Sequence, residues 1–207
     1  MSEPAPVTPT SMWEQRYAAS HYVFGTEPND FLRAQVSALP AGEVLCLAEG
    51  EGRNSVFLAG QGYVVSSFDL SEAGVAKTRL LAAERHATVN AAVGDLSVVD
   101  IGTDRWMGIV SIFAHMPPKV RRGLHSRVVA ALAPGGVFLL EAYTPAQVGR
   151  GTGGPSDPAM TPTLELLRGE LDGLEFLHGV ELEREVIEGS GHSGLASVVQ
   201  VIARRPR

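Results

Sequence analysis

The sequence predicts an α/β fold with a doubly wound, mostly parallel sheet. Between residues 43 and 143, short apolar runs alternate with segments of helical periodicity, and beyond them two long strand-like runs flank a glycine-rich turn. Strands that alternate with helices of this length form right-handed βαβ units, so their sheet is mainly parallel and covered on both faces. The last two strands then form an antiparallel hairpin at one edge. We therefore expect a Rossmann-like sheet of seven strands.

The expected elements follow the hydrophobic pattern along the chain. Strands are expected at 43–48, 63–69, 87–95, 106–114, 136–143, 174–187 and 194–204, where apolar, β-branched and aromatic residues run together. Helices are expected from Met12, at 30–39, 53–62 and 71–86, from Pro117 to the glycines at 135–136, and near 162–172. The first eleven residues hold three prolines with Ser and Thr, a composition typical of a flexible tail.

Composition limits the classes of protein to which the chain can belong. Its 207 residues, 44% hydrophobic and 19% charged, predict one globular domain over residues 12–207. A net charge of -6 with scattered basic residues predicts no nucleic-acid partner. The single cysteine, Cys46, allows no internal disulfide and no cysteine-based metal site, and we expect no metal. Without a signal-peptide pattern or a run of about 18 apolar residues, we expect a cytoplasmic monomer or homodimer with no membrane partner.

The stretch "VLCLAEGEGRN" (44–54) places acids and glycines where the first strand ends. In open α/β sheets, ligands bind beyond the carboxyl ends of the strands. Gly50 and Gly52 would let a ligand lie against the backbone, and the helix from Arg53 would point its N-terminus at that ligand. The alternative for so short a motif is an ordinary strand–helix turn, in which the glycines serve the backbone conformation and no ligand binds.

Two further carboxylates lie at the ends of the next two strands. Asp69 follows Gly50 by 19 residues, the position from which a carboxylate reaches ribose hydroxyls. Asp95, in "VGDL", could accept a hydrogen bond from an adenine amino group. Each alone is compatible with a helix cap or a turn, but together they outline a nucleoside.

The charge of the first turn favours one class of nucleoside cofactor. A dinucleotide would place its pyrophosphate beside Glu49 and Glu51, and Ser55 stands where the third glycine is usual. S-adenosylmethionine carries a positive sulfur and an ammonium group, which these acids attract. The residues therefore favour methyl transfer.

Three segments carry a family resemblance. The succession of "VLCLAEGEGRNSVFLAGQGYVVSSFDLS", "VGDL" and "APGGVFLLEAY" resembles class I S-adenosylmethionine-dependent methyltransferases over about residues 40–145. "MWEQRYAASHYVFGTEPNDFL", "EGEGRN" and "FAHMPPKVRRGLHSRVVAALAPGG" resemble the branch with tellurite-resistance and thiopurine-type methyltransferases, over nearly the whole chain. The resemblance implies lid helices in 12–40, a cofactor-binding core in 41–145, and a substrate loop with the hairpin in 146–207.

The resemblance also implies roles for individual residues around the cofactor. The family's first motif has an acid and a glycine where this chain has Cys46 and Ala48, so the acid has in effect moved to Glu49. At the methionine end of the cofactor, the expected contacts are Glu49 or the backbone of Ala48 and Gly50, with Arg53 and Asn54 beside them. Asp69 is expected at the ribose, and Asp95 and Leu96 at the adenine. Leu70 or Ile112 would pack on the adenine, and Phe113 and Ala114 would lie under the cofactor.

The N-terminal segment and the later loops supply the remaining candidates. The resemblance implies a lid formed by Trp13, Tyr17, Tyr22, Phe24, Gly25 and Arg53, with ordinary core packing of the aromatic side chains as the alternative. His115, in "FAHMPP", would act as a base or line the acceptor pocket, unless it is a solvent-facing residue at a helix start. Further pocket candidates are Glu141, Tyr143, Arg150 and His192, the last at the hairpin tip or simply in its turn.

The sequence thus predicts a methyltransferase that acts on a small acceptor, such as a thiol or a chalcogen oxyanion like tellurite, and releases S-adenosylhomocysteine. A sulfonium is a strong methyl donor, so the protein chiefly has to place the acceptor in line and exclude water. Two alternatives stay open: a non-catalytic S-adenosylmethionine or nucleoside-binding module, and an NAD-dependent oxidoreductase.

Overall fold

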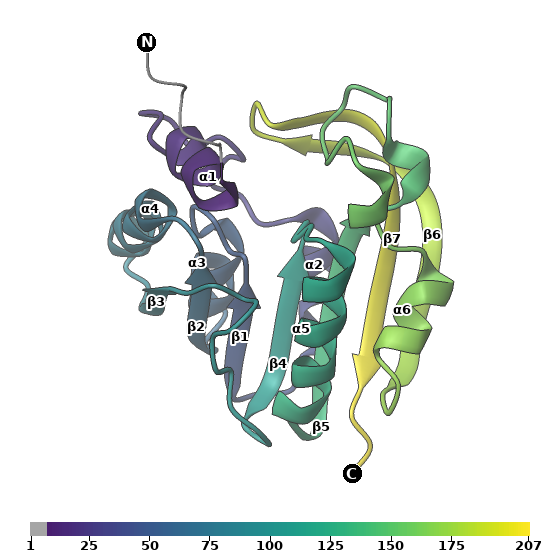
Figure 1. Cartoon of the computed structure of the whole chain (residues 1–207). Helices are drawn as coiled ribbons and strands as arrows, with labels where there is room; N and C mark the ends of the chain where they lie inside the picture. The colour runs from purple at the N-terminus through teal and green to yellow at the C-terminus, as the bar shows by residue number, and fades with distance from the viewer. Residues whose placement is uncertain (1–7) are drawn as a thin grey trace.

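One mixed sheet organises the computed structural model, which describes residues 8–207. Its strand order is β3-β2-β1-β4-β5-β7-β6, as Figure 1 shows. The strands are β1 Glu43–Leu47, β2 Val64–Asp69, β3 Val89–Val93, β4 Trp106–Ile112, β5 Leu132–Tyr143, β6 Glu175–Glu188 and β7 His192–Arg204. The first five are mutually parallel, and β7 pairs antiparallel with both β5 and β6. The predicted seven-stranded α/β fold with an antiparallel C-terminal hairpin is confirmed.

Helices cover both faces of this sheet. They are α1 Pro9–Tyr17, α2 Asp30–Gln35, α3 Arg53–Gly60, α4 Glu72–Glu84, α5 Pro118–Ala131 and α6 Leu164–Glu170, with short 3-10 turns η1 Val36–Ala38, η2 Pro145–Gln147 and η3 Pro158–Met160. Helix α1 begins before the expected Met12 because Thr8 and Ser11 form a capping box, in which each side chain accepts from the other's backbone N–H. Residues 8–11 therefore do not form the expected flexible tail, and residues 1–7 lie outside the described residues.

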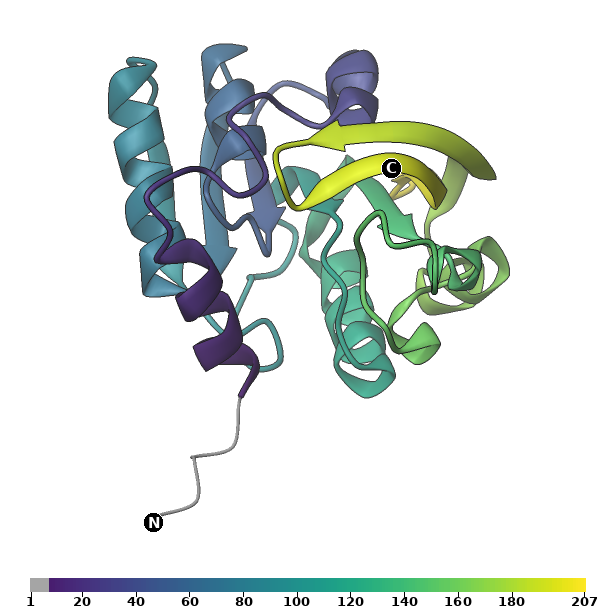
Figure 2. The same ribbon diagram turned by 90° about the horizontal axis from the view of Figure 1, so that it is seen from above.

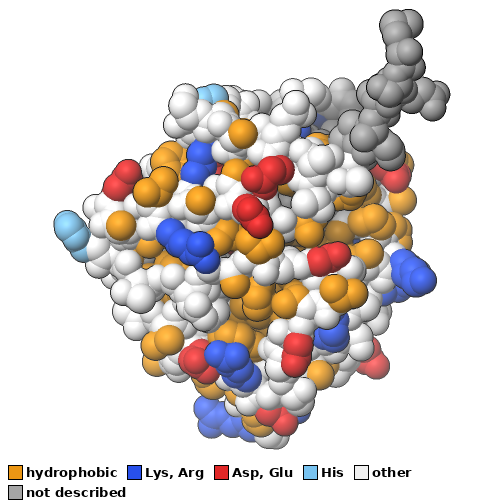
Figure 3. Space-filling model, turned by 60° about the vertical axis from the view of Figure 1, so that its left-hand side comes forward, with side chains coloured by type: hydrophobic (Ala, Val, Ile, Leu, Met, Phe, Trp, Pro, Cys, Tyr) orange, Lys and Arg blue, Asp and Glu red, His pale blue; other side chains and the backbone are white. Residues whose placement is uncertain are grey.

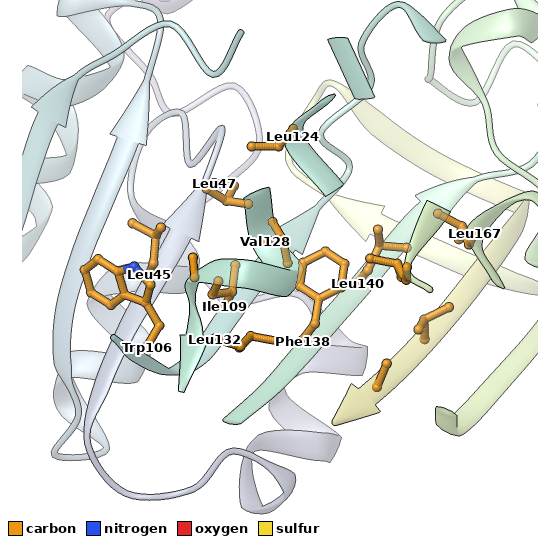
Figure 4. Close-up of a cluster of buried hydrophobic side chains, with 14 of the residues drawn as sticks. Leu45, Leu47, Trp106, Ile109, Leu124, Val128, Leu132, Phe138, Leu140 and Leu167 are labelled. Atoms are coloured by element: carbon orange, nitrogen blue, oxygen red, sulfur yellow. The ribbon is translucent and has the colours of Figure 1, made fainter. Parts of the chain in front are cut away.

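The central strands are buried on both faces, as their continuous apolar runs predict. In β1, Leu45 and Leu47 face α5 and α6, where they join the cluster shown in Figure 4. Val44 and Cys46 face the opposite side and pack with residues of α2 and α3. Cys46 is a fully buried free thiol, as expected for a core residue.

Two segments from the chain ends meet above the carboxyl ends of the parallel strands. Helix α1 lies beside α4, and the segment after it passes over the ends of β1 and β2, where the β6–β7 turn approaches it (Figure 2). Ser190 N–H and Gly191 N–H both donate to the Val23 carbonyl, at 2.9 and 3.1 Å. The turn is shorter than "EGSGHSG", because β6 extends to Glu188 and β7 starts at His192.

The surface shows no concentration of one charge on the face in Figure 3, where acidic and basic side chains are interspersed among hydrophobic ones. Among residues 8–207, no helix has both the length and the apolar character needed to cross a lipid bilayer.

Candidate active site

The turn after β1 has left-handed backbone at three positions. Ala48 has φ 49°, Gly50 has φ 63° and Gly52 has φ 93°. A Cβ on Gly50 would lie 2.6 Å from the Tyr17 hydroxyl, and one on Gly52 would lie 2.7 Å from the Thr78 backbone. Glycine is therefore required at both positions so that α1 and α4 can pack against the turn. The sequence analysis expects a ligand, rather than these helices, to lie against the two glycines.

Glu49 caps the helix that follows this turn. Its Oε1 accepts from Asn54 N–H at 2.9 Å and from Ser55 N–H at 2.7 Å, while Oε2 has no hydrogen-bond partner among residues 8–207. Burial raises the pKa of Glu49 to about 7, against the lowering effects of the hydrogen bonds from Ser55 and Asn54 and of the Arg53 charge. One oxygen of this acid is thus fixed by α3 and the other is available to a cation.

Asp69, at the end of β2, connects the end of β2 to the turn after β1 through hydrogen bonds. It accepts from Gly50 N–H at 2.7 Å and from Ser71 N–H at 2.9 Å, and burial raises its pKa. A carboxylate has about four lone-pair sites, so two amide bonds leave capacity for ligand hydroxyls. Asp69 lies where the prediction placed it.

Two acids hold the N-terminal segment against these strand ends: Glu14, for which the sequence predicts no role, and Glu51, which the sequence analysis expects to attract the cofactor. Glu14 accepts from the Ser71 hydroxyl at 2.6 Å and from Ala73 N–H at 3.1 Å, at the start of α4. Glu51 is buried and accepts from Val23 N–H at 2.7 Å and from the Lys77 ammonium at 2.7 Å. Glu51 therefore anchors the segment after α1.

The structure separates the residues expected at the adenine. Asp95 is exposed after β3, and its hydrogen bonds to Ser97 lower its pKa. Leu96 is buried in the core, so only its backbone remains for a ligand, and Leu70 is half-buried. A cavity of about 500 Å³ lies beside the carboxyl end of β3 and the start of α4; its lining includes Ala73 and Val93.

Strained backbone marks the end of β4. Phe113 has φ 52°, a conformation that is rare for a bulky residue and that clusters at functional sites. Its N–H donates to the Glu141 carbonyl at 2.7 Å, and its ring stacks on that of Tyr143 with 4.5 Å between centroids. Ala114, which follows, is half-buried.

His115 is placed near the strand ends, but its environment disfavours the base role. Its Nε2 accepts from Tyr143 N–H at 3.0 Å, so the lone pair of the neutral imidazole is already used. Burial, followed by the charge of His192, lowers the pKa of His115 to about 3. We therefore correct the expectation of a base: His115 is a neutral side chain whose Nδ1–H can donate.

Aromatic rings connect the N-terminal segment to the hairpin. Trp13 stacks on Tyr17 at 5.4 Å, Tyr17 lies 6.4 Å from Phe24, and Phe24 lies 4.6 Å from the His192 ring. His192 in turn lies 4.9 Å from Phe113. These rings pack together, as the core-packing alternative proposed, and they do so above the strand ends, where a lid would lie.

Two of the three remaining lid candidates lie in the segment between α1 and α2. The Tyr22 hydroxyl donates to the Lys77 carbonyl at 3.3 Å, and Gly25 has φ 73°. A second cavity, of about 200 Å³, lies between this segment and the hairpin and is lined in part by Phe24, Gly25 and Glu188.

Arg53 and Asn54 form hydrogen bonds within a buried polar network instead of facing the predicted cofactor site. Arg53 pairs with Glu188 at 2.6 Å, and Asn54 Oδ1 accepts from Asn29 N–H at 2.9 Å. Glu188 Oε1 also accepts from the Asn29 side chain at 2.8 Å, and Oε2 lies 3.3 Å from His192 Nδ1. Although burial raises the pKa of Glu188, these partners bring it down to about 2.

Glu141 holds the second half of this network. It is fully buried and accepts from Arg184 at 2.6 and 2.8 Å, from Gln200 at 2.6 Å and from Asn29 at 2.6 Å. Arg150, by contrast, pairs with Glu183 on the surface, so the structure does not bring it into the site.

Two buried polar atoms at these strand ends have no partner among residues 8–207: Arg53 Nη1 and the Tyr143 hydroxyl. Unpaired buried donors are costly, so such atoms often mark places where a ligand completes the bonding. The described residues hold no group of three His, Cys, Asp or Glu placed to bind a metal ion.

Known proteins share this architecture. Residues 44–136 match the family model described as a methyltransferase domain. A structure from work on the conversion of a disulfide bond into a thioacetal group in echinomycin biosynthesis has a TM-score of 0.78 at 19% identity, covering 95% of this chain and 91% of that one.

Two further structures show the same fold. TehB from Haemophilus influenzae has a TM-score of 0.65 at 21% identity, covering 93% of this chain and 65% of that one. Magnesium protoporphyrin IX methyltransferase from Synechocystis PCC 6803, with bound SAH, has a TM-score of 0.62 at 18% identity, covering 95% and 83%. No curated protein matches the chain in sequence.

Proposed function

We propose that the protein is an enzyme that transfers a methyl group from S-adenosylmethionine to a small acceptor, on the premise that residues 44–136 match the family model of a methyltransferase domain. The observation that carries the proposal is the charge at the ends of β1 and β2. Glu49 and Asp69 receive hydrogen bonds from backbone amides, and no basic side chain forms an ion pair with either among the described residues. A donor with a positive sulfur and an ammonium group complements these acids.

The residues present fit this donor. The free Oε2 of Glu49, with the backbone of Ala48 and Gly50, would hold the methionine end, and Asp69 would accept from the ribose. Asp95 and the Leu96 backbone would contact the adenine, with Phe113 and Ala114 beneath. When bound, S-adenosylmethionine supplies a methyl group on a positively charged sulfur, and S-adenosylhomocysteine is left. The segment from Trp13 to Gly25 covers these strand ends and would exclude water.

For the acceptor, we propose a thiol or a chalcogen oxyanion. The resemblance to the tellurite-resistance and thiopurine branch supports this class, and so does the likeness to a structure concerned with a disulfide-to-thioacetal conversion. We further propose a cytoplasmic protein, monomeric or homodimeric, with no nucleic-acid or membrane partner. The free, buried Cys46 is compatible with a reducing compartment.

Calorimetry with Asp69→Ala tests the donor site. Removing the carboxylate takes away the proposed ribose contact, so affinity for S-adenosylmethionine should fall at least about tenfold, the effect of losing one charged hydrogen bond. Asp172→Ala, at an exposed turn position, is the matched control and should bind like the wild type. Unchanged affinity in Asp69→Ala would refute this placement.

The same titrations separate the alternatives. Tight NAD binding without S-adenosylmethionine binding would indicate an oxidoreductase. Binding of S-adenosylmethionine without product from any thiol or from tellurite would indicate a non-catalytic binding module.

A further inference from the structure

Helix α4 leaves one long side uncovered at the edge of the sheet. It packs against β3, the edge strand, and its outer side exposes Glu72, Ala76, Arg79 and Leu80. The Leu80 side chain is 59% exposed, and Val93, at the end of β3, is 48% exposed. Figure 3 brings this side of the molecule forward and shows hydrophobic side chains gathered near its middle. Large apolar side chains that lie together on a surface mark an interaction site.

The cavity of about 500 Å³ lies along this uncovered side, between the first half of α4 and the end of β3. Its apolar walls include Ala73 and Ala76 from the helix and Val93 from the strand, and its charged rim is formed by Glu72 and Arg79. None of its lining residues is a proposed cofactor contact. The small apolar walls suit an apolar side chain that enters from another molecule.

The two rim residues carry opposite charges on the same side of the helix. Glu72 and Arg79 are seven residues apart, which is about two helical turns, so their side chains project in nearly the same direction. Neither forms an ion pair among residues 8–207. Both charges are therefore available to a partner.

The edge of β3 does not favour the addition of another strand. This strand has only five residues, and Arg79 Nη2 donates to the Ala91 carbonyl of β3 at 2.7 Å. Short length and a charged side chain laid along the backbone are two ways in which proteins protect an edge strand from pairing. A partner would therefore dock on α4 and the cavity rather than extend the sheet.

A second copy of this chain matches the surface in shape and charge. If two α4 helices pack antiparallel about a two-fold axis at Ala76, residues at equal distances on either side of Ala76 face each other. Leu80 lies four residues after Ala76 and Glu72 four before it, so Leu80 of each copy comes over the cavity of the other. Arg79 of each copy then lies beside Glu72 of the other. The small side chain at the axis lets the two helices approach closely.

We infer that the chain forms a homodimer through α4, with Leu80 of each copy in the cavity of the other and with Glu72 and Arg79 paired across the two-fold axis. This surface is self-complementary, which a two-fold interface requires and an unrelated partner does not. A helix of 13 residues is about 20 Å long, so the interface lies near the lower end of the range of specific interfaces. Association is therefore reversible, with a dissociation constant of about 10–100 μM.

Sedimentation equilibrium of the full chain, over concentrations that bracket this constant, tests the dimer. Glu72→Arg and Arg79→Glu each place like charges opposite each other at two symmetric positions. Each variant alone should therefore associate at least about tenfold more weakly than the wild type. Mixed in equal amounts, the two variants again have opposite charges at both positions, and a heterodimer should form about as tightly as the wild-type dimer.

Matched substitutions on α6, on the opposite face of the sheet, are the controls. Glu165→Arg makes the same change in the first turn of that helix and should leave the dimer intact. Leu80→Gln should weaken association at least about tenfold, because it removes the apolar side chain that fills the cavity. Leu166→Gln, also at an exposed leucine, should not. Circular dichroism confirms that each variant is folded.

Three results would overturn this inference. The first is a wild type that stays monomeric at the highest concentration. The second is a dimer that Leu80→Gln and both charge variants leave unchanged, which would place the interface elsewhere. The third is a mixture of the two charge variants that forms no heterodimer, which would exclude the two-fold arrangement. Donor binding is measured separately by calorimetry, so the failure of the dimer would leave the proposed function standing.

Discussion

Acidic side chains lie in two groups at the carboxyl ends of the strands, and the two groups have different hydrogen-bond partners. On the proposed donor side, formed by the ends of β1 and β2, Glu49 and Asp69 accept hydrogen bonds from backbone amides. On the proposed acceptor side, formed by β5 to β7, Glu141 and Glu188 accept from arginine, asparagine and glutamine side chains. Burial raises the pKa of Glu49 to about 7 in spite of its amide bonds, whereas the side-chain partners of Glu188 outweigh burial and lower its pKa to about 2.

This difference indicates the charge of the ligand that each side would bind. Backbone amides fix the position of a carboxylate without cancelling its full charge, so the donor side retains an attraction for a cation. Side-chain cations cancel the charge, so the acceptor side is prepared for a neutral molecule. Arg53 lies between the two sides, since it begins α3 on the donor side and pairs with Glu188 on the acceptor side.

The largest expected effect comes from breaking a charge pair on the acceptor side. Glu141→Gln removes the fully buried carboxylate that pairs with Arg184 and leaves that guanidinium only Asp30 at 3.6 Å and Glu188 at 3.8 Å, which should cost about 3 kcal/mol of unfolding free energy. Urea denaturation measures this loss. Glu183→Gln, which removes an exposed partner of Arg150, should cost less than about 1 kcal/mol. If both variants lose the same small amount, the acceptor-side network is not the stabilising unit that the structure describes.

An intermediate effect is expected from Glu49 on the donor side. Its folded pKa of about 7 exceeds the ordinary 4.5, so the folded state binds more protons between these values and stability falls as pH rises through that window. After allowance for solvent screening, the loss is roughly 1–2 kcal/mol. Glu49→Gln should abolish it, as read from denaturation midpoints between pH 4.5 and 8.

A control and a ligand sharpen this second prediction. Glu84→Gln, at an exposed position of α4, should keep the wild-type pH dependence. Saturating S-adenosylmethionine should remove the dependence from the wild type, because a cationic ligand lowers the pKa of Glu49. A wild-type curve that stays flat without ligand would contradict the raised pKa.

The smallest effect concerns the turn that carries Glu49. Ala48 adopts φ 49°, which costs an L-residue about 1 kcal/mol relative to glycine. Ala48→Gly should therefore stabilise the protein by about 0.5–1 kcal/mol, measured by thermal unfolding. Ala59→Gly within α3 should have the opposite sign. Destabilisation by Ala48→Gly would show that the methyl group's packing outweighs the backbone strain.

The donor side could be predicted from sequence because its contacts are local. Gly50 and Asp69 are 19 residues apart, and their strands are adjacent in the βαβ order. The periodicity that predicts strands therefore also predicts which residues end them at the same place. The periodicity did not predict that the two glycines make room for Tyr17 and Thr78, because the positions of these residues depend on how α1 and α4 pack against the turn.

The acceptor side could not be predicted in the same way. Glu188 lies 135 residues from Arg53 and 159 from Asn29, and no local pattern joins such partners. The position of His115 was predicted, but its role depends on Tyr143 N–H, a backbone donor that no residue type reveals. His192 was expected at the tip of a turn, and only the hairpin register places it opposite Glu188.

The segment around Val23 has a kinetic consequence. Its backbone is held from one side by Glu51 and from the other by the β6–β7 turn through Ser190. One short stretch of chain thus connects the turn after β1 to the β6–β7 turn, and a displacement of this segment would break both sets of hydrogen bonds. Under the proposed function, access to the two substrates would therefore be coupled, because one displacement would uncover both.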